Sequence, residues 1–131
     1  MAMTLVKYRA NKVTISAAGM PRALVYKAIA NKVEEIDVTG LPLGAFPDIP
    51  YQQKEMELCP GDALILMSDG LPERFNDKDD ILDYPGARKL AEEVAHEAPQ
   101  AIIDHLVRAG NEWANGRPQD DDVTFVVVKM K

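Results

Sequence analysis

A period-two alternation of apolar and polar residues runs through much of the first half of the chain, and such alternation is typical of β-strands. Residues 13–17 alternate strictly, and residues 4–9 are rich in strand-forming side chains. A short polar connection at residues 10–12 joins the two as a hairpin. Residues 23–27 and 32–36 repeat this arrangement. The pattern therefore predicts two β-hairpins, the first with one buried face.

The middle of the chain predicts further strands after an ordered loop. Residues 40–50 contain two glycines and three prolines, a composition that indicates a loop rather than a helix. Residues 55–58 alternate charged and apolar side chains, as in a half-exposed strand. Residues 63–67 are apolar throughout, which predicts a strand covered on both faces. A last strand, rich in β-branched residues, is expected at residues 123–129.

The helices are expected late in the chain. Residues 86–97 place apolar side chains four apart on one stripe. Residues 99–113 begin with a proline suited to a first helical turn, continue with an i, i+3, i+4 apolar pattern, and end at an Asn-Gly-Arg-Pro stop signal. Together the elements predict a single α/β domain over residues 4–130, with residues 1–3 interpreted as a start or cloning remnant.

Composition and charge narrow the classes of function. The chain has 131 residues, of which 47% are apolar, enough for one buried core. Fifteen basic and twenty-one acidic residues give a formal net charge of −6, which argues against nucleic-acid binding and against attraction to anionic membranes. No apolar run has the length of a membrane span, and the N-terminus shows no signal-peptide pattern. A cytoplasmic location is expected.

The residues that could supply a nucleophile are few. The single cysteine, Cys59, excludes an internal disulfide and any zinc site built from several thiolates. We expect it to be a buried packing thiol in a reducing compartment. The two histidines, His96 and His105, are expected inside the two helices as ordinary helix residues. The candidate chemistry therefore rests on carboxylates.

Acidic residues stand at the ends of two predicted strands. Asp69 follows the apolar strand at 63–67 and precedes Gly70, which permits a tight turn. Residues 120–122 are three consecutive aspartates just before the last strand, and they repel one another unless a cation or a helix N-terminus neutralises them. Each segment also has a purely structural interpretation, an Asx cap for Asp69 and a solvated loop for 120–122. Together, oxygen-only ligands favour Mg²⁺ or Mn²⁺.

Five short motifs follow one another along the chain. They are Ala18-Gly19-Met20-Pro21, Leu41-Pro42-Leu43-Gly44, Pro60-Gly61-Asp62, Ser68-Asp69-Gly70-Leu71 with Glu73, and Asp121-Asp122-Val123-Thr124. In this order and spacing they resemble the SpoIIE-type serine phosphatases, the bacterial branch of the type 2C metal-dependent protein phosphatases. The resemblance covers residues 4–129. It implies an α/β fold, a β-sandwich flanked by helices, and hydrolysis of phosphoserine or phosphothreonine in a protein by water held between two Mn²⁺ or Mg²⁺ ions.

The resemblance also implies roles for individual residues. Asp69 and Asp121 correspond to metal ligands of the family, and no side chain acts as the nucleophile. Supporting positions are matched by Gly19, Gly44, Gly70, Asp122 and Thr124. The usual substrates of this branch are phosphorylated anti-sigma-factor antagonists in bacterial stress and sporulation signalling. The expected partner is therefore a phosphoprotein of that kind.

Two departures from the family pattern affect these expectations. Met20 stands where the family commonly has histidine, and a thioether cannot replace imidazole as a hydrogen-bonding group or as a ligand of hard cations. A Gly-Asp-x-x-Gly-His-Gly type segment and an upstream acidic ligand have no counterpart, so the chain resembles the C-terminal part of a catalytic domain. We therefore expect weak metal binding, little activity of the chain alone, and association of copies through exposed sheet edges.

Two further classes of function remain open. The first is a non-catalytic module that keeps the phosphatase-like fold and binds phosphoproteins without hydrolysing them. The second is an unrelated Mg²⁺-dependent phosphohydrolase acting on a small molecule, which would need a basic pocket. The arginines of the chain are scattered along the sequence, so this class ranks last. Those considered are Arg22, Arg74, Arg88 and Arg117.

Overall fold

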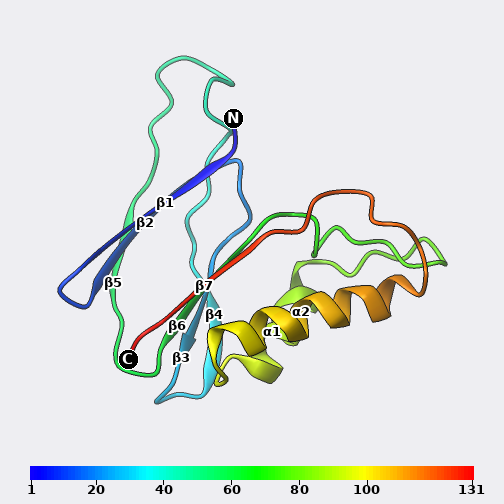
Figure 1. Ribbon diagram of the computed structural model, residues 1–131. Helices are drawn as coiled ribbons and strands as arrows, with labels where there is room; N and C mark the ends of the chain where they lie inside the picture. The colour runs from blue at the N-terminus through cyan, green and yellow to red at the C-terminus, as the bar shows by residue number, and fades with distance from the viewer.

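Two antiparallel sheets and two helices form three layers (Figure 1). The computed structural model describes residues 1–131. The first sheet has the strand order β1-β2-β5, with β1 Met3–Arg9, β2 Lys12–Ala18 and β5 Lys54–Glu57. The second has the order β4-β3-β6-β7, with β3 Leu24–Lys27, β4 Lys32–Glu35, β6 Ala63–Met67 and β7 Phe125–Lys129. The helices are α1 Tyr84–Val94 and α2 Pro99–Ala114.

The two predicted hairpins are confirmed. The β1–β2 turn has Ala10 at φ 48° and Asn11 at φ 64°, the pair of positive values that a tight two-residue hairpin turn requires. β3 pairs with β4 through a second short turn that contains Asn31 at φ 47°. The order β3-β6 then places the apolar strand β6 in the middle of the second sheet.

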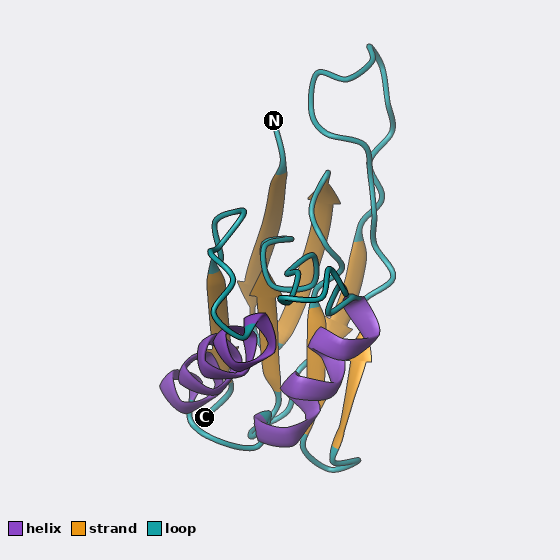
Figure 2. Cartoon of the chain, turned by 90° about the vertical axis from the view of Figure 1, so that its right-hand side faces the viewer, coloured by secondary structure: helices purple, strands orange, loops and turns teal.

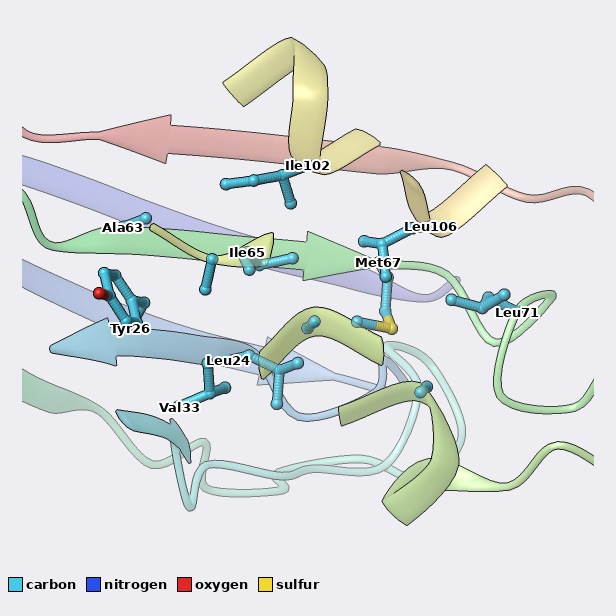
Figure 3. Packing of buried hydrophobic residues seen from close by; sticks show 12 residues of the cluster. Leu24, Tyr26, Val33, Ala63, Ile65, Met67, Leu71, Ile102 and Leu106 are labelled. Carbon is cyan, nitrogen blue, oxygen red and sulfur yellow. The ribbon is translucent and has the colours of Figure 1, made fainter. Parts of the chain in front are cut away.

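The hydrophobic core lies in two clusters, one on each side of the four-stranded sheet. Between the sheets, Val13 and Ile15 pack with Val25 and Leu64. On the other face, the strands pack against both helices, which lie on one side of the strands (Figure 2). There Leu24, Tyr26 and Ile65 of the sheet belong to one cluster with Ile102 and Leu106 of α2 (Figure 3), and Ala87 and Ala91 of α1 join the same cluster. β6 is thus covered on both faces, as its sequence predicts.

Helix α1 begins and ends earlier than expected. The Asp83 carboxylate accepts a hydrogen bond from the N–H of Gly86 at 2.6 Å, which caps the helix before Tyr84. The helix ends at Val94, so His96 lies in the following turn, and the expectation that it is a helical residue was wrong. His105 does lie within α2. Neither helix is long and apolar enough to cross a membrane.

The last strand is anchored to the end of α1 by one side chain. The Lys129 ammonium group donates hydrogen bonds to the carbonyl oxygens of His96 and Glu97, both at 2.6 Å, and to that of Ala95 at 3.3 Å. These carbonyl groups lie at and beyond the C-terminus of α1, where a positive charge is favourable.

Cys59 is exposed, so the expectation of a buried packing thiol was wrong. It lies in the turn between β5 and β6, and its backbone N–H donates to the Asp62 carboxylate at 3.0 Å. This turn is shaped by polar contacts to Asp62, and the cysteine side chain takes no part in the core.

Each sheet has one edge strand whose inward-facing residues are exposed. Val6 pairs with the buried Ile15, yet is 38% exposed. Val126 and Val128 pair with Leu66 and Leu64, on the face that packs between the sheets, yet are 50% and 42% exposed. The sandwich core is therefore open along parts of β1 and β7.

Candidate metal centre

The end of β6 and the loop before β7 are joined by Ser68. Its Oγ donates to the carbonyl oxygen of Asp122 at 2.9 Å and accepts from the N–H of Thr124 at 2.9 Å. The N–H of Ser68 also donates to the carbonyl oxygen of Thr124 at 3.0 Å. These hydrogen bonds bring together the two segments that carry Asp69 and Asp121. We call this arrangement the Ser68 junction.

Gly70 allows the two segments to touch. A β-carbon on Gly70 would lie 2.3 Å from the carbonyl oxygen of Asp122 and 3.1 Å from Cγ2 of Val123. Because these distances are shorter than van der Waals contact, any other residue would push the Asp122 segment away. The structure thus gives Gly70 a packing role at the junction, and its place beside a metal ion stays a prediction.

Asp69 and Glu73, together with the hydroxyl group of Tyr84, form a small cluster that we call the acidic corner. The Asp69 carbonyl oxygen accepts from the N–H of Glu73 at 2.8 Å, which places the two acidic residues on one turn. The Tyr84 hydroxyl donates to Oε1 of Glu73 at 3.4 Å. Burial raises the pKa of Tyr84, and the negative charges of Glu73 and Asp69 raise it further. The sequence reasoning gave Glu73 no role, although its four-residue spacing from Asp69 was visible.

The aspartates of the loop before β7 are solvent-accessible. Oδ1 of Asp121 accepts from the N–H of Asp122 at 2.7 Å, so this carboxylate partly orders its own loop. Asp122 and Thr124 contribute to the junction through their backbone groups. Their role as supporting positions of a metal site, which the resemblance implies, stays a prediction.

The acidic side chains near the Ser68 junction are the right kind of ligand for a hard cation, but they are few. Asp69, Glu73, Asp121 and Asp122 offer only oxygen atoms, the ligands that Mg²⁺ and Mn²⁺ prefer. No three acidic, histidine or cysteine side chains converge tightly enough to form a metal-binding group. A single ion between Asp69 and Asp121 would therefore keep most of its water ligands, as Mg²⁺ commonly does in proteins.

The two remaining predicted glycines lie in different places. Gly19 has φ 64°, and a β-carbon there would lie 2.7 Å from Cγ of Pro42, so only glycine fits this corner. Gly44, at φ 81°, lies in the long loop near the N-terminus (Figure 1), where its neighbour Leu43 exchanges backbone hydrogen bonds with Met1. The structure does not bring Gly44 to the Ser68 junction.

A cavity of about 460 Å³ lies beside the acidic corner, and sequence reasoning missed it. Its wall includes Tyr84 together with Met20 from the Ala-Gly corner and Met67 from the end of β6. Arg22 and Arg88 also line it, although they lie far apart in the sequence. No local pattern could reveal their approach, because they lie on separate elements.

The charges of both arginines are compensated within the chain. Arg22 forms ion pairs with Glu35 at 3.5 Å and with Asp37 at 3.2 Å. Arg88 pairs with Glu92 at 3.2 Å, one helical turn away. The cavity wall is thus mixed in charge, which does not resemble the bare basic pocket that a nucleotide phosphatase would need.

Asp62, from the Pro-Gly-Asp motif, has a structural role. Its buried carboxylate accepts from the N–H of Ala28 at 2.8 Å and of Cys59 at 3.0 Å, and pairs with the Lys27 ammonium group at 3.0 Å. Burial alone would raise the pKa of Asp62, but the two backbone donors and Lys27 outweigh it and lower the pKa. The motif therefore fixes the turn before β6.

Comparison with known proteins gives consistent results. All residues, 1–131, match the family model described as Stage II sporulation protein E (SpoIIE). The phosphoserine phosphatase RsbU of Bacillus subtilis is 30% identical over an alignment of 122 residues, and the match covers 90% of this chain and 35% of RsbU. The chain thus spans about a third of this relative's length.

Solved structures share the fold at low sequence identity. The phosphatase domain of SpoIIE from Bacillus subtilis, presoaked with Mn, superposes with a TM-score of 0.76 at 18% identity, over 98% of this chain and 56% of that one. The SiaA-PP2C domain of Pseudomonas aeruginosa gives 0.79 at 18% identity, over 99% and 51%. The RsbU and RsbW domains of Rv1364c from Mycobacterium tuberculosis give 0.73 at 21% identity, over 98% and 35%. With the fold and the full-length family match in agreement, the chain belongs to the SpoIIE family and has the mixed α/β fold of the PP2C phosphatase domains.

Proposed function

We propose that this chain forms part of a metal-dependent protein phosphatase that removes phosphate from phosphoserine or phosphothreonine in a regulatory protein. The Ser68 junction carries the proposal, because it sets Asp69 and Asp121 at neighbouring strand ends. The similarity to RsbU, a phosphoserine phosphatase, supports the reaction class. Hydrolysis of an exposed phosphoserine also agrees with the absence of a bare basic pocket around Arg22 and Arg88.

The proposed cofactor is Mn²⁺ or Mg²⁺, held by Asp69 and Asp121. Such an ion would polarise phosphoryl oxygens and make a bound water more acidic. The chain's own contribution is positional. Ser68 and Gly70 fix the separation of the two carboxylate-bearing segments, and Glu73 adds negative charge beside Asp69.

The proposed partner is a phosphorylated anti-sigma-factor antagonist in the cytoplasm. Support comes from RsbU and from the solved chain that combines RsbU and RsbW domains, since both point to a regulatory protein network. The cavity beside Tyr84 lies next to the acidic corner. It would face the protein surface that surrounds the phosphorylated residue.

Activity of this chain by itself is proposed to be low. The residues present supply no group of three converging ligands, and the two-metal arrangement of the family needs more carboxylates than Asp69 and Asp121 provide. The same observation favours a second candidate, a phosphatase-like module that binds a phosphoprotein without hydrolysing it. The two candidates differ in turnover and agree in fold.

The test combines metal binding with turnover. Mn²⁺ binding is followed by electron paramagnetic resonance, and hydrolysis of p-nitrophenyl phosphate and of a phosphoserine peptide is assayed with and without Mn²⁺. We expect weak Mn²⁺ binding that Asp69→Asn and Asp121→Asn each reduce at least tenfold. Asp48→Asn, in an exposed loop at φ 57°, serves as the matched control and should leave binding unchanged.

The outcomes separate the candidates. Peptide binding without turnover supports the non-catalytic module. Mn²⁺-dependent turnover that Asp69→Asn abolishes establishes the phosphatase and contradicts the low activity proposed for this chain. Mn²⁺ binding equal in Asp69→Asn, Asp121→Asn and Asp48→Asn would overturn the assignment of the metal ligands.

A further inference from the structure

Arg74 is a buried guanidinium group without an acidic partner. The residue is only 9% exposed, and no carboxylate lies within 4.0 Å of its nitrogens. Its Nη1 donates to Oε1 of Gln119 at 3.0 Å. Its Nε is fully buried and has no hydrogen-bond partner. One neutral amide is therefore all that compensates this charge.

Four other arginines of the chain show how unusual a guanidinium group without an acidic partner is. Arg22, Arg88, Arg108 and Arg117 each form an ion pair with a carboxylate, although all are more exposed than Arg74. A buried charge without a counter-ion is costly, because desolvation is not repaid by attraction. A buried donor that lacks an acceptor adds a further cost. Arg74 therefore has the character of a group that awaits an anionic ligand.

Arg74 lines a cavity of about 130 Å³ that contains no acidic side chain. Leu71, Leu106 and Gly110 form apolar parts of the wall, and the amides of Asn111 and Gln119 are its other polar groups. Val107 and Asn111 are exposed on α2, so the cavity reaches the surface there. The space is large enough for a carboxylate group, since one water takes about 30 Å³ of liquid volume.

We propose that this cavity is a binding site for a carboxylate. Because Nη1 is engaged by Gln119, the parallel donors that lack an acceptor are Nε and Nη2, and since Nε is shielded from solvent, the Arg74 side chain must shift for a carboxylate to reach both. These parallel N–H donors match the two oxygens of a carboxylate. The side-chain amides of Asn111 and Gln119 provide further donors at the rim. The ligand is either a small free carboxylate or the side chain of an aspartate or glutamate on a bound protein.

The site lies next to the candidate metal centre along the chain, and the two have no residue in common. Arg74 follows Asp69 by one short turn, and Gln119 directly precedes the aspartates at 120–122. The carbonyl oxygen of Arg74 accepts from the indole N–H of Trp113 at 3.1 Å, which fixes the backbone of the site to α2. The inference does not depend on the proposed phosphatase function, because it requires neither metal binding nor turnover.

The probe for the site is acetate. Thermal unfolding of the full chain is measured in sodium acetate and in sodium chloride at matched ionic strength. We expect a saturable rise of the melting temperature of about 4 °C in acetate. The blocked tripeptide Gly-Glu-Gly tests a protein side chain as the source. A stronger effect of the tripeptide identifies a protein ligand, whereas an effect of acetate alone identifies a small molecule, and both support the site.

Two substitutions test the role of Arg74. Arg74→Lys keeps the charge but loses the paired donors, so acetate affinity should fall at least tenfold. Gln119→Glu places a carboxylate beside Nη1, so it should raise the melting temperature without acetate and remove the response to acetate. Arg88→Lys is the matched control, since its guanidinium group is already paired with Glu92.

Two results would overturn the proposal. One is an acetate response that is absent or no larger than that to chloride in the unsubstituted chain. The other is an acetate response that survives both Arg74→Lys and Gln119→Glu. Gln119→Glu is expected to stabilise the fold. Its response to acetate therefore still tests the site if Arg74→Lys does not fold.

Discussion

The Ser68 hydroxyl oxygen and the Asp122 carbonyl oxygen lie 2.9 Å apart although 54 residues separate them in the sequence. This contact joins the strand end that carries Asp69 to the loop that carries Asp121. A single hydrogen bond of this kind adds only modestly to stability. Its larger effect is on the geometry of the two carboxylates, and the two effects can be measured separately.

Replacing Ser68 by alanine should lower the affinity for Mn²⁺ strongly and the free energy of unfolding only modestly. The change removes both side-chain hydrogen bonds of Ser68, and we expect a loss of about 1–2 kcal/mol in the free energy of unfolding. Urea unfolding and Mn²⁺ titration measure the two quantities. Ser16→Ala is the control, because Ser16 Oγ donates to the Gln52 carbonyl oxygen at 2.8 Å in the other sheet. Equal Mn²⁺ affinities in both variants would contradict the role of the junction.

Gly70→Ala should be one of the more damaging small substitutions. The added methyl group would lie 2.3 Å from the Asp122 carbonyl oxygen, so the loop must move. We expect a loss of about 2–3 kcal/mol from this overpacking, measured by urea unfolding. Gly86→Ala, whose β-carbon meets only the flexible Leu82 side chain at 3.1 Å and the Asp83 carboxylate at 3.2 Å, should change stability by less than about 0.5 kcal/mol. Similar losses in the two variants would show that the Asp122 loop yields freely.

Asp62 should make the fold sensitive to acid. The pKa of Asp62 is lower in the folded chain than the ordinary value of 3.8, so folding favours the ionised form. Its contribution is complete at neutral pH, declines as the pH falls below 3.8, and is lost below the folded pKa. Urea unfolding between pH 3 and 7 measures this decline, which Asp62→Asn should make shallower.

The same substitution should also cost stability at neutral pH. The neutral amide of Asp62→Asn would lose the ionic character of the contacts to Lys27 and to the two backbone donors, a cost of about 1–3 kcal/mol. Asp104→Asn, on the exposed surface of α2, is the control and should leave the acid limb unchanged. If stability falls equally with decreasing pH in Asp62→Asn and in the unsubstituted chain, Asp62 does not cause the sensitivity to acid.

The exposed edges should let copies of the chain associate. Val126, on β7, is 50% exposed although it faces the side that is buried elsewhere in the sheet. We expect concentration-dependent association in sedimentation velocity, reduced by Val126→Lys, because a charge blocks edge pairing. Ile29→Lys, in the β3–β4 turn and 92% exposed, should associate like the unsubstituted chain. A monomer at high concentration would contradict this prediction.

Local patterns sufficed for much of the fold. β6 could be predicted because its apolar run must be covered on both faces, and this also placed Asp69 at a rigid strand end. The end of α2 followed from its stop signal, which Asn115 realises at φ 47°. By contrast, α1 starts earlier than its apolar stripe suggests, because Asp83 caps it before the first apolar contact.

The parts that could not be predicted depend on strand order and on distant contacts. The approach of Arg22 to Arg88 needs β3, β4 and α1 to be placed in space, which no local pattern specifies. The exposure of Cys59 follows from a turn built around Asp62. Similarly, the isolation of Arg74 is visible only when every neighbouring carboxylate has been located.

Strand β7 is clamped at both ends. Ser68 binds the backbone just before its first residue, and Lys129 binds the carbonyl groups beyond α1 at its last. A shift of β7 by two residues along β6 would preserve the inward and outward faces of the strand, yet it would break both anchors at once. Both anchors hold β7 in its register on β6, and the Ser68 anchor also holds the backbone next to Asp121. Loss of the Lys129 hydrogen bonds should therefore loosen β7 and, through this strand, the loop that carries Asp121.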